Sequence, residues 1–434
     1  MRFRFLPAVA LLLAGGTLTA QASPDLTLDQ LLEIGLENNS DIRIAERNLM
    51  AAKAGRRGSY SGLVPSLRAS FQRDLKTATF RDPITNTRVE TERGYGSQAS
   101  LIQTIYDGGA SWYNASAGRN EVQSAQAALD RARQQSVLAI KQAYFSSLSR
   151  LELLEVAEEA LELSRRQLEL VVERYRLQAV KKTDLLKAKV SVGQREADRH
   201  RAQQNVSTAI TSLLLALGQD PVTRLSVARD SVTVEPLPQR QVAFGSLRAN
   251  HPALRVQARA VERAWLNAKM QRGVLLPTIS LSYAMSASGI QLNDAYDFDY
   301  ENEGTARLNV SIPLFTGLQS TSRYSRLRYA ALAEEERLDA LERDLKGQLE
   351  NTLSSLESLH QIHPLNREIL NSAEADVRLA EEQYRLGAIS ILDLLDAQVS
   401  LITARSTLVR TTYEIKIAEA ELQALMGVAV NTSS

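Results

Sequence analysis

The chain of 434 residues contains no cysteine, so no disulfide can form and no lipid can be attached through a cysteine. Aromatic residues make up only 5% of it, and the 11 prolines and 21 glycines are sparse over long stretches. Such a composition suits long helices better than globular cores. The 51 basic and 50 acidic residues almost cancel, which gives no electrostatic case for nucleic-acid binding. Long apolar runs are also missing after residue 22, where the densest is only Leu213–Leu217.

The first 22 residues have the three parts of a secretory signal peptide. Arg2 and Arg4 give a cationic start, and an apolar stretch follows from Phe5 to Leu18. Ala20–Ala22 then has the small-x-small form that signal peptidase cleaves. We therefore expect an exported, unlipidated mature chain.

The sequence contains two copies of one structural unit. Leu63–Leu67 resembles Leu275–Ile279 at an offset of 212, and Tyr175–Val180 resembles Tyr384–Ile389 at an offset of 209. Because one three-residue shift relates the two offsets, we expect a duplicated fold. The predicted organisation is a signal peptide (1–22), a first repeat (23–217), a linker (218–241), a second repeat (242–427) and a short tail (428–434). In the first repeat we expect a β-hairpin at about 66–105 and a long helical hairpin at about 109–217. In the second we expect a β-hairpin at about 278–314 and a long helical hairpin at about 317–427.

Each copy changes its periodicity along its length. After Pro277 apolar and polar residues alternate, and a return segment alternates again from Leu308 to Leu314. This pattern predicts strands. A helical pattern then continues for about 70 residues, or about 105 Å, and its last part shows heptad spacing, which predicts coiled-coil rods. Each rod turns near 177–183 or 386–392 and returns as a second long helix.

An exported chain with strands of membrane length has to close its sheet, because unpaired strand edges cannot face lipid. Four strands per chain cannot close a barrel. Two chains would supply eight strands, whose side chains fill the interior, whereas three would supply twelve and leave a passage. We therefore predict a mainly α, internally duplicated fold in which a trimeric twelve-stranded transmembrane β-barrel is continued by a long α-helical barrel.

These features resemble the TolC-like outer membrane efflux family. The resemblance is carried by the duplicated plan, by Pro65 and Pro277 before the two hairpins, and by the segments Tyr384–Ala388 and Asp393–Ala397. It implies a homotrimer in contact with the lipid of the outer membrane of a Gram-negative bacterium, with a long periplasmic portion. It also implies a passive, gated duct for efflux or type I secretion, joined through a periplasmic adaptor (membrane fusion) protein to an inner-membrane transporter of the ABC or RND type. The cargo stays open between drugs, proteins and metals.

Asp393 and Asp396 lie three residues apart, so both carboxylates belong to one helix face. The resemblance places this pair at the periplasmic constriction, where three chains would superpose six carboxylates around one axis. A narrow ring of like charges would repel anions and bind cations. Our hypothesis is a cation-selective entrance that polyvalent cations block; the alternative is a pair of solvated surface acids.

Thr183, Asp184 and Tyr384 match positions that in the family link neighbouring helical hairpins and hold the entrance closed. A family member compared with this chain carries an arginine where this chain has Ile389, so one arm of that network is absent. We hypothesise that the three residues form a gate latch.

Two further differences concern the tip. Lys181 and Lys182 at the neighbouring turn are either substitutes for the missing arginine or simply exposed lysines. Lys187 stands where the second copy has Asp396, so the two hairpins are not equivalent there. We therefore expect broken six-fold pseudosymmetry at the tip.

Other classes of protein have little support. The sequence has no phosphate-binding glycine loop and no nucleophile elbow, so we predict no enzyme, no catalytic residue and no cofactor. We interpret His360 and His363, followed by Pro364, as two exposed histidines beside a helix kink, because a metal site would need a third ligand. The rival function is a periplasmic coiled-coil adaptor of a transport complex. Adaptors carry one helical hairpin, however, and this chain has two.

Overall fold

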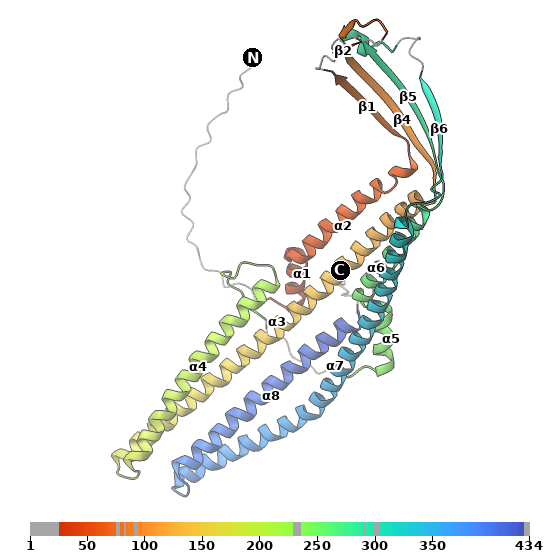
Figure 1. Ribbon diagram of the computed structural model, residues 1–434. Coiled ribbons are helices and arrows are strands. Elements are labelled where there is room, and N and C mark those ends of the chain that lie inside the picture. Colours follow the sequence, from red (N-terminus) through yellow and green to blue (C-terminus); the bar gives the residue numbers. More distant parts are fainter. Residues whose placement is uncertain are drawn as a thin grey trace, which may run out of the picture.

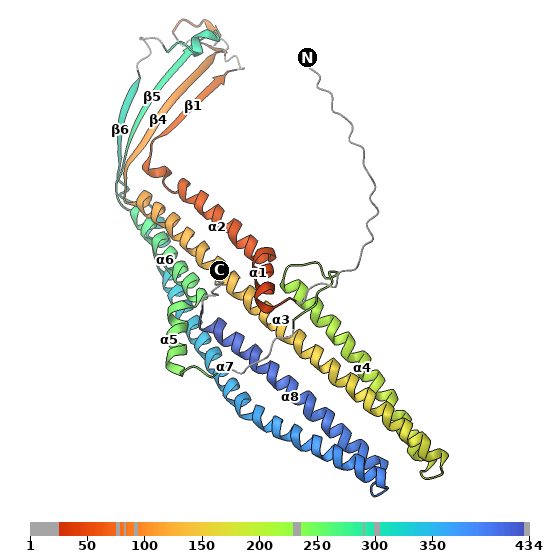
Figure 2. The ribbon, with the colours of Figure 1, turned by 180° about the vertical axis from the view of Figure 1, so that it is seen from behind.

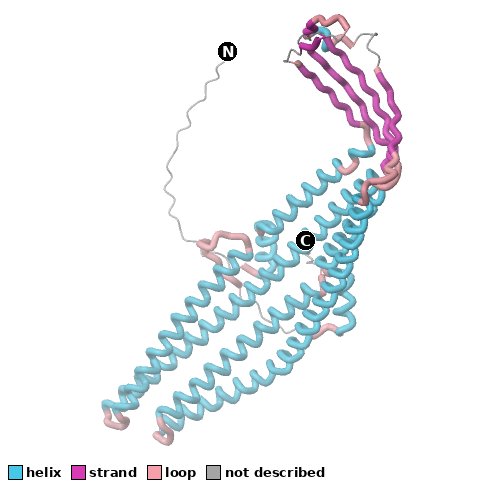
Figure 3. The backbone as a smooth tube through the Cα atoms, viewed as in Figure 1, coloured by secondary structure: helices cyan, strands magenta, loops and turns pink. Residues whose placement is uncertain are grey.

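The structure, a computed structural model, describes residues 26–74, 79–81, 84–90, 94–228, 236–289, 291–298 and 304–428. The molecule is long and narrow, with strands at one end and helices over the rest of its length (Figures 1 and 3). The predicted signal peptide lies outside the described residues. So do residues 229–235 of the predicted linker and all but the first residue of the predicted tail.

The order of elements is duplicated, as predicted. The first copy comprises α1 (Leu28–Asn38), α2 (Ser40–Gly58), η1 (Ser61–Leu63), β1 (Ser66–Arg73), β2 (Thr79–Arg81), β3 (Arg88–Glu90), β4 (Tyr95–Asp107), α3 (Ala110–Arg176) and α4 (Lys182–Ala216). The second comprises α5 (Arg240–Asn250), α6 (Pro252–Gly273), β5 (Thr278–Gly289), η2 (Asn293–Ala295), β6 (Thr305–Ser311), α7 (Gln319–Leu386) and α8 (Ile391–Leu425). Each copy thus contributes two shorter helices, one large β-hairpin and one long helical hairpin, and the first copy adds the small antiparallel pair β2-β3.

The two β-hairpins form one antiparallel sheet with the strand order β1-β4-β5-β6. The copies meet where β4 pairs with β5, for example at Leu101 opposite Tyr283. β6 ends at Ser311, so the prediction of a strand reaching Leu314 is wrong at its end. Pro313 explains the early end, because proline cannot donate a hydrogen bond to a neighbouring strand.

Each strand of the sheet continues into a helix. α2 leads into β1, β4 into α3, α6 into β5 and β6 into α7. These helices pack side by side in the order α2-α3-α6-α7, which is the order of the strands (Figures 1 and 2). The change from β4 to α3 uses Gly108, whose φ is +69° and where a Cβ would lie 2.1 Å from the carbonyl oxygen of Gly273. A glycine is required there for close approach as well as for the turn.

The short helices pack on the middle of the rods. α1 buries Leu31 against Ile140 and Tyr144 of α3, and α5 buries Leu247 beside Leu349 of α7. Burial of one such leucine contributes about 1.5 to 3 kcal/mol. These two cores form the thickened middle of the molecule.

The long helices give the molecule its length. α3 has 67 residues and α7 has 68, or about 100 Å each. Pro364 lies inside α7 without ending it. None of the helices that the structure describes contains an apolar stretch long enough to cross a membrane.

Candidate functional site: an amphipathic sheet and the tip of the helical hairpins

The two faces of the four-stranded sheet differ in polarity. On one face Leu67, Leu101 and Tyr283 stand in one row across the strands, and Leu281 stands beside Leu308 in another. The opposite face is polar except for Ile102 and Ala284, with the side chains of Ser66, Arg68, Ser70, Gln98, Ser100, Ser280, Ser282, Ser286, Arg307 and Asn309. Leu67 is 77% exposed in the single chain. An apolar face opposite a polar face is what a strand between lipid and a water-filled interior requires.

The sheet has two open edges. Within the described residues β1 pairs only with β4 and β6 pairs only with β5, so one side of each outer strand has no partner strand. Unpaired backbone groups in lipid cost several kcal/mol each. Each outer edge can therefore accept a further strand.

At the other end of the molecule the two helical hairpins turn close together (Figure 1). Residues 177–181 join α3 to α4, and residues 387–390 join α7 to α8. A buried cluster contains Val171, Ala188, Val377, Ala380, Tyr384, Ile391, Leu394 and Ala397. Because all four helices contribute to this cluster, the two tips of one chain share one core.

Two acids cap the helices that start at these turns. The Asp393 carboxylate accepts hydrogen bonds from the Ser390 hydroxyl at 2.8 Å and from the Ser390 N–H at 3.0 Å. These hydrogen bonds lower the pKa of Asp393 below its usual value. At the equivalent position of α4, Asp184 accepts from the N–H of Lys181 at 3.3 Å and has no hydroxyl partner among the described residues. Both acids therefore stabilise helix starts in addition to any role in a passage.

Asp396 lies one turn beyond Asp393 on α8 and is exposed in the single chain. The equivalent residue of α4, Lys187, is exposed as well. Two acids on one hairpin thus correspond to an acid and a base on the other. The two hairpin tips of one chain therefore differ in charge, as the repeat offset predicts.

Tyr384 is 3% exposed, and its hydroxyl has no hydrogen-bond partner among the described residues. Burial raises the pKa of this hydroxyl, which stays protonated at neutral pH. Thr183 is exposed and Asp184 is half-buried, and no hydrogen bond is found between either side chain and Tyr384 within the described chain. The three predicted latch residues are thus near one another without being joined in a single copy.

Arg174 joins the two tips, and sequence reasoning missed it. Its Nη1 donates to the carbonyl oxygen of Tyr384 at 2.8 Å, and its Nη2 donates to the carbonyl of Arg385. The guanidinium carbon lies 5.0 Å from the centre of the Tyr384 ring, within the range of a cation–π contact. The equivalent residue of the second copy is Gln383, so the repeat comparison contained this asymmetry.

The position of the missing family arginine is apolar. Ile389 packs against the tip cluster, as does the equivalent Val180 of the first copy. Lys181 and Lys182 are exposed and form no ion pair with a described residue. The cation that does contact Tyr384 comes from α3.

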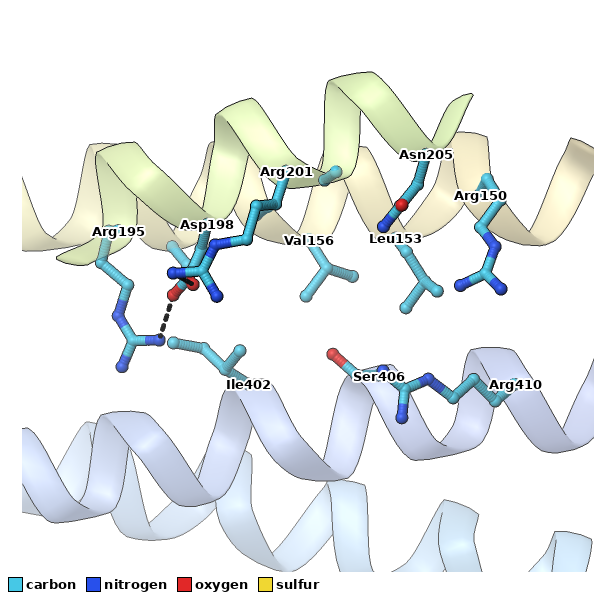
Figure 4. A pocket seen from close by; sticks show the side chains of 13 residues that line it. Arg150, Leu153, Val156, Arg195, Asp198, Arg201, Asn205, Ile402, Ser406 and Arg410 are labelled. Carbon is cyan, nitrogen blue, oxygen red and sulfur yellow. Dashed lines mark hydrogen bonds and ion pairs between the residues drawn. The ribbon is translucent and has the colours of Figure 1, made fainter. Parts of the chain in front are cut away.

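A basic groove lies between the two hairpins above their tips (Figure 4). Its volume is about 330 Å³, with α3 as its floor and α4 and α8 as its sides. Arg150, Arg195, Arg201 and Arg410 line it, whereas Asp198 is the one acid among its lining residues. Asp198 pairs with Arg195 at 3.5 Å and with Arg201 at 3.3 Å, while the other two arginines have no ion-pair partner among the described residues. Arg201 and Arg410 are equivalent in the two repeats, a signal that the offset of 209 could have revealed.

The histidine pair lies on α7. His360 and His363 are half-buried, so the expectation of two exposed histidines is wrong. His363 Nε2 lies 3.2 Å from the Thr412 hydroxyl, and burial lowers the pKa of its imidazole. The described part of the chain contains no group of three or more side chains that could hold a metal ion.

Comparisons with known proteins agree with this architecture. A family model described as "Outer membrane efflux protein" matches residues 31–219 and 243–428, once in each repeat. Outer membrane efflux protein BepC of Brucella suis is 25% identical over 95% of this chain and 88% of its own length. Alkaline protease secretion protein AprF of Pseudomonas aeruginosa is 23% identical over 91% and 83%. The CmeC outer membrane channel of Campylobacter jejuni, a solved structure, has a TM-score of 0.82 at 16% identity over 92% of this chain and 85% of CmeC. These matches confirm the predicted resemblance and fold class.

Proposed function

This chain belongs to the outer membrane efflux protein family, and from that premise we propose that three copies form one passive, gated duct for efflux or secretion. The protein is located in the outer membrane, with a long helical portion in the periplasm. Members of the family are channels and not enzymes. The family match covers both repeats and favours the duct over a periplasmic adaptor.

The sheet with two open edges carries the proposal of a trimer. Three copies pair β1 of one chain with β6 of the next and close a ring of twelve strands, the smallest multiple of four that leaves a passage. The apolar face then meets lipid and the polar face lines the interior. The continuous order of strands and helices extends the same ring into the periplasm.

Cross-linking tests this closure. The native chain has no cysteine, so Arg68→Cys on β1 and Asn309→Cys on β6 introduce one pair on the polar face. Oxidation in isolated outer membranes should give a covalent ladder that ends at the trimer. Ser100→Cys on the central strand β4, combined with Asn309→Cys, serves as the matched control and should give no ladder. A ladder that ends at the dimer would contradict the trimer.

The periplasmic entrance is the second part of the proposal. Asp393 and Asp396 of three chains surround the axis and make the entrance selective for cations, and the latch formed by Thr183, Asp184 and Tyr384 keeps it closed. The buried Tyr384 hydroxyl supports a link between chains, because a buried donor without a partner costs about 1 to 3 kcal/mol. Within one chain the cation beside the Tyr384 ring is Arg174.

Single-channel recordings separate the charge of the acids from their capping role. Asp393→Asn with Asp396→Asn removes both charges but keeps an oxygen that can accept from Ser390. We expect loss of cation selectivity and of block by polyvalent cations. Ser390→Ala is the control, because it weakens the cap and keeps the charges. Unchanged selectivity in the double variant would refute the charged entrance.

An adaptor and an inner-membrane transporter of the ABC or RND type complete the proposed system. The relatives named for efflux and for protease secretion support a multi-component complex. The basic groove between the hairpins offers a cationic surface to an acidic helical hairpin of the adaptor. Co-purification with the adaptor after charge reversal at Arg150 tests this contact.

A further inference from the structure

The helix segments next to the sheet carry charges of one sign only. These segments are 50–58 of α2, 110–120 of α3, 264–273 of α6 and 319–333 of α7. They contain no acidic residue and nine basic residues, which we call the basic collar: Lys53, Arg56, Arg57, Arg119, Lys269, Arg272, Arg323, Arg326 and Arg328. All nine are exposed in the single chain, and none forms an ion pair with a described residue.

In α7 the collar is not a property of the whole helix. The remainder of α7, residues 334–386, contains 13 acidic and 6 basic residues. The turns between the sheet and these segments (59–65, 108–109, 274–277 and 312–318) contain no acid. The nearest one, Asp107 at the end of β4, accepts a hydrogen bond from the N–H of Ser111 at 2.8 Å. Acidic side chains are therefore absent where the helices approach the strands, and in α7 they are abundant farther from the sheet.

Aromatic and apolar side chains separate the collar from the sheet. Phe315 is 80% exposed and Trp112 is 68% exposed in the single chain, and each lies between a strand and the first collar cation of its helix. Aromatic residues of this kind gather at the boundary between hydrocarbon and headgroups. The molecule thus passes from apolar strands through exposed aromatic rings to cations, which is the order expected across a membrane interface.

The distances match the headgroup layer. Arg323 and Arg326 lie about 6 and 10 Å along α7 from its first residue, at 1.5 Å rise per residue. The headgroup region is about 5 to 8 Å thick on each side of the bilayer. A long arginine side chain can extend along the protein toward that layer, so both guanidinium groups can reach it.

We propose that the basic collar binds the anionic headgroups of phospholipids in the periplasmic leaflet of the outer membrane. A cluster of cations beside a membrane-spanning element attracts anionic lipids, and guanidinium groups bind phosphate oxygens with two hydrogen bonds. The collar would fix the depth of the sheet in the bilayer. The inference rests on the part of the proposed function that puts the sheet in lipid and is independent of the entrance.

Reconstitution of the full protein tests the collar. Arg56→Gln, Arg323→Gln and Arg326→Gln together form the collar variant. Arg343→Gln, Arg367→Gln and Arg378→Gln form the control, which removes three exposed, unpaired charges from the lower part of α7. Detergent-purified protein is inserted into vesicles of phosphatidylcholine alone or with phosphatidylglycerol, and native mass spectrometry then compares the two lipids retained by the protein.

The wild type and the control should retain phosphatidylglycerol preferentially, and high salt should reduce the preference. In the collar variant the ratio of retained phosphatidylglycerol to phosphatidylcholine should fall about tenfold. Equal retention of both lipids by the wild type, or an equal loss of preference in the control, would overturn the proposal that the collar binds lipid and leave the proposed duct unaffected. A collar variant that changes ion selectivity and keeps its lipid preference also overturns it, because the arginines would then line the passage. Failure of the wild type to insert into any vesicle would overturn the proposed function as well.

Discussion

Replacing Arg174 with glutamine removes the cation that links the two hairpin tips of one chain. In the wild type its guanidinium donates to the carbonyls of Tyr384 and Arg385 and lies over the Tyr384 ring. Both carbonyls belong to the last turn of α7, where the negative end of the helix dipole attracts a cation. Glutamine keeps a donor but loses the charge and the forked geometry.

The structure sets the size of the effect. A hydrogen bond from a charged donor contributes about 1.5 to 3 kcal/mol. Because Arg174 is only half-buried, solvent screening reduces the sum, and we take about 2 kcal/mol for the two bonds and the ring contact together. This corresponds to a factor of about 30 in the equilibrium between joined and separated tips. The apolar tip cluster remains, so the variant should fold.

Resting conductance in planar bilayers measures the separation. Arg174→Gln should raise the fraction of time that a channel spends in open states by about 30-fold. Arg176→Gln is the matched control, because Arg176 pairs at 3.0 Å with Glu173 of its own helix and does not touch the other hairpin. Closed-state currents equal to those of the wild type, or an equal increase in the control, would refute the idea that Arg174 holds the tips together.

Three further predictions concern the tip and the groove. Gln178 has a φ of 57° where the second repeat has Gly387, so Gln178→Gly should stabilise the first turn by about 1 kcal/mol and slow hydrogen exchange of its amides; faster exchange would contradict this. The lowered pKa of Asp393 means that its cap is present at neutral pH and is lost as the pH falls through the folded value. Ser390→Ala should raise that pKa, and cation block measured against pH should disappear at a higher pH than in the wild type; an unchanged midpoint would count against the hydrogen bonds. Arg150→Glu should reduce recovery of the adaptor in pull-downs about tenfold and leave trimer formation intact, whereas full recovery would exclude the groove.

Most of the architecture was predictable because it depends on local periodicity. Alternation after Pro277 gave β5, and the sustained helical pattern gave rods whose observed ends at Arg176 and Leu386 lie at the predicted turns. The repeat offset predicted the duplicated order of elements and the mismatch of Lys187 with Asp396. Proline explains the one strand whose end was misplaced, since Pro313 acts on backbone pairing and not on the hydrophobic pattern.

The tertiary structure decided which residues meet. Arg174 lies 210 residues from Tyr384 in sequence, and no pattern within either repeat indicates their contact. The tip cluster likewise decided that Ile389 is a packed apolar residue, and the order α2-α3-α6-α7 brought the cations of four separate segments together beside the sheet. Periods of two and 3.6 residues are set by the backbone and can be read along the chain. Contacts between distant helices depend on how their surfaces pack, and that information is present only when the chain is folded.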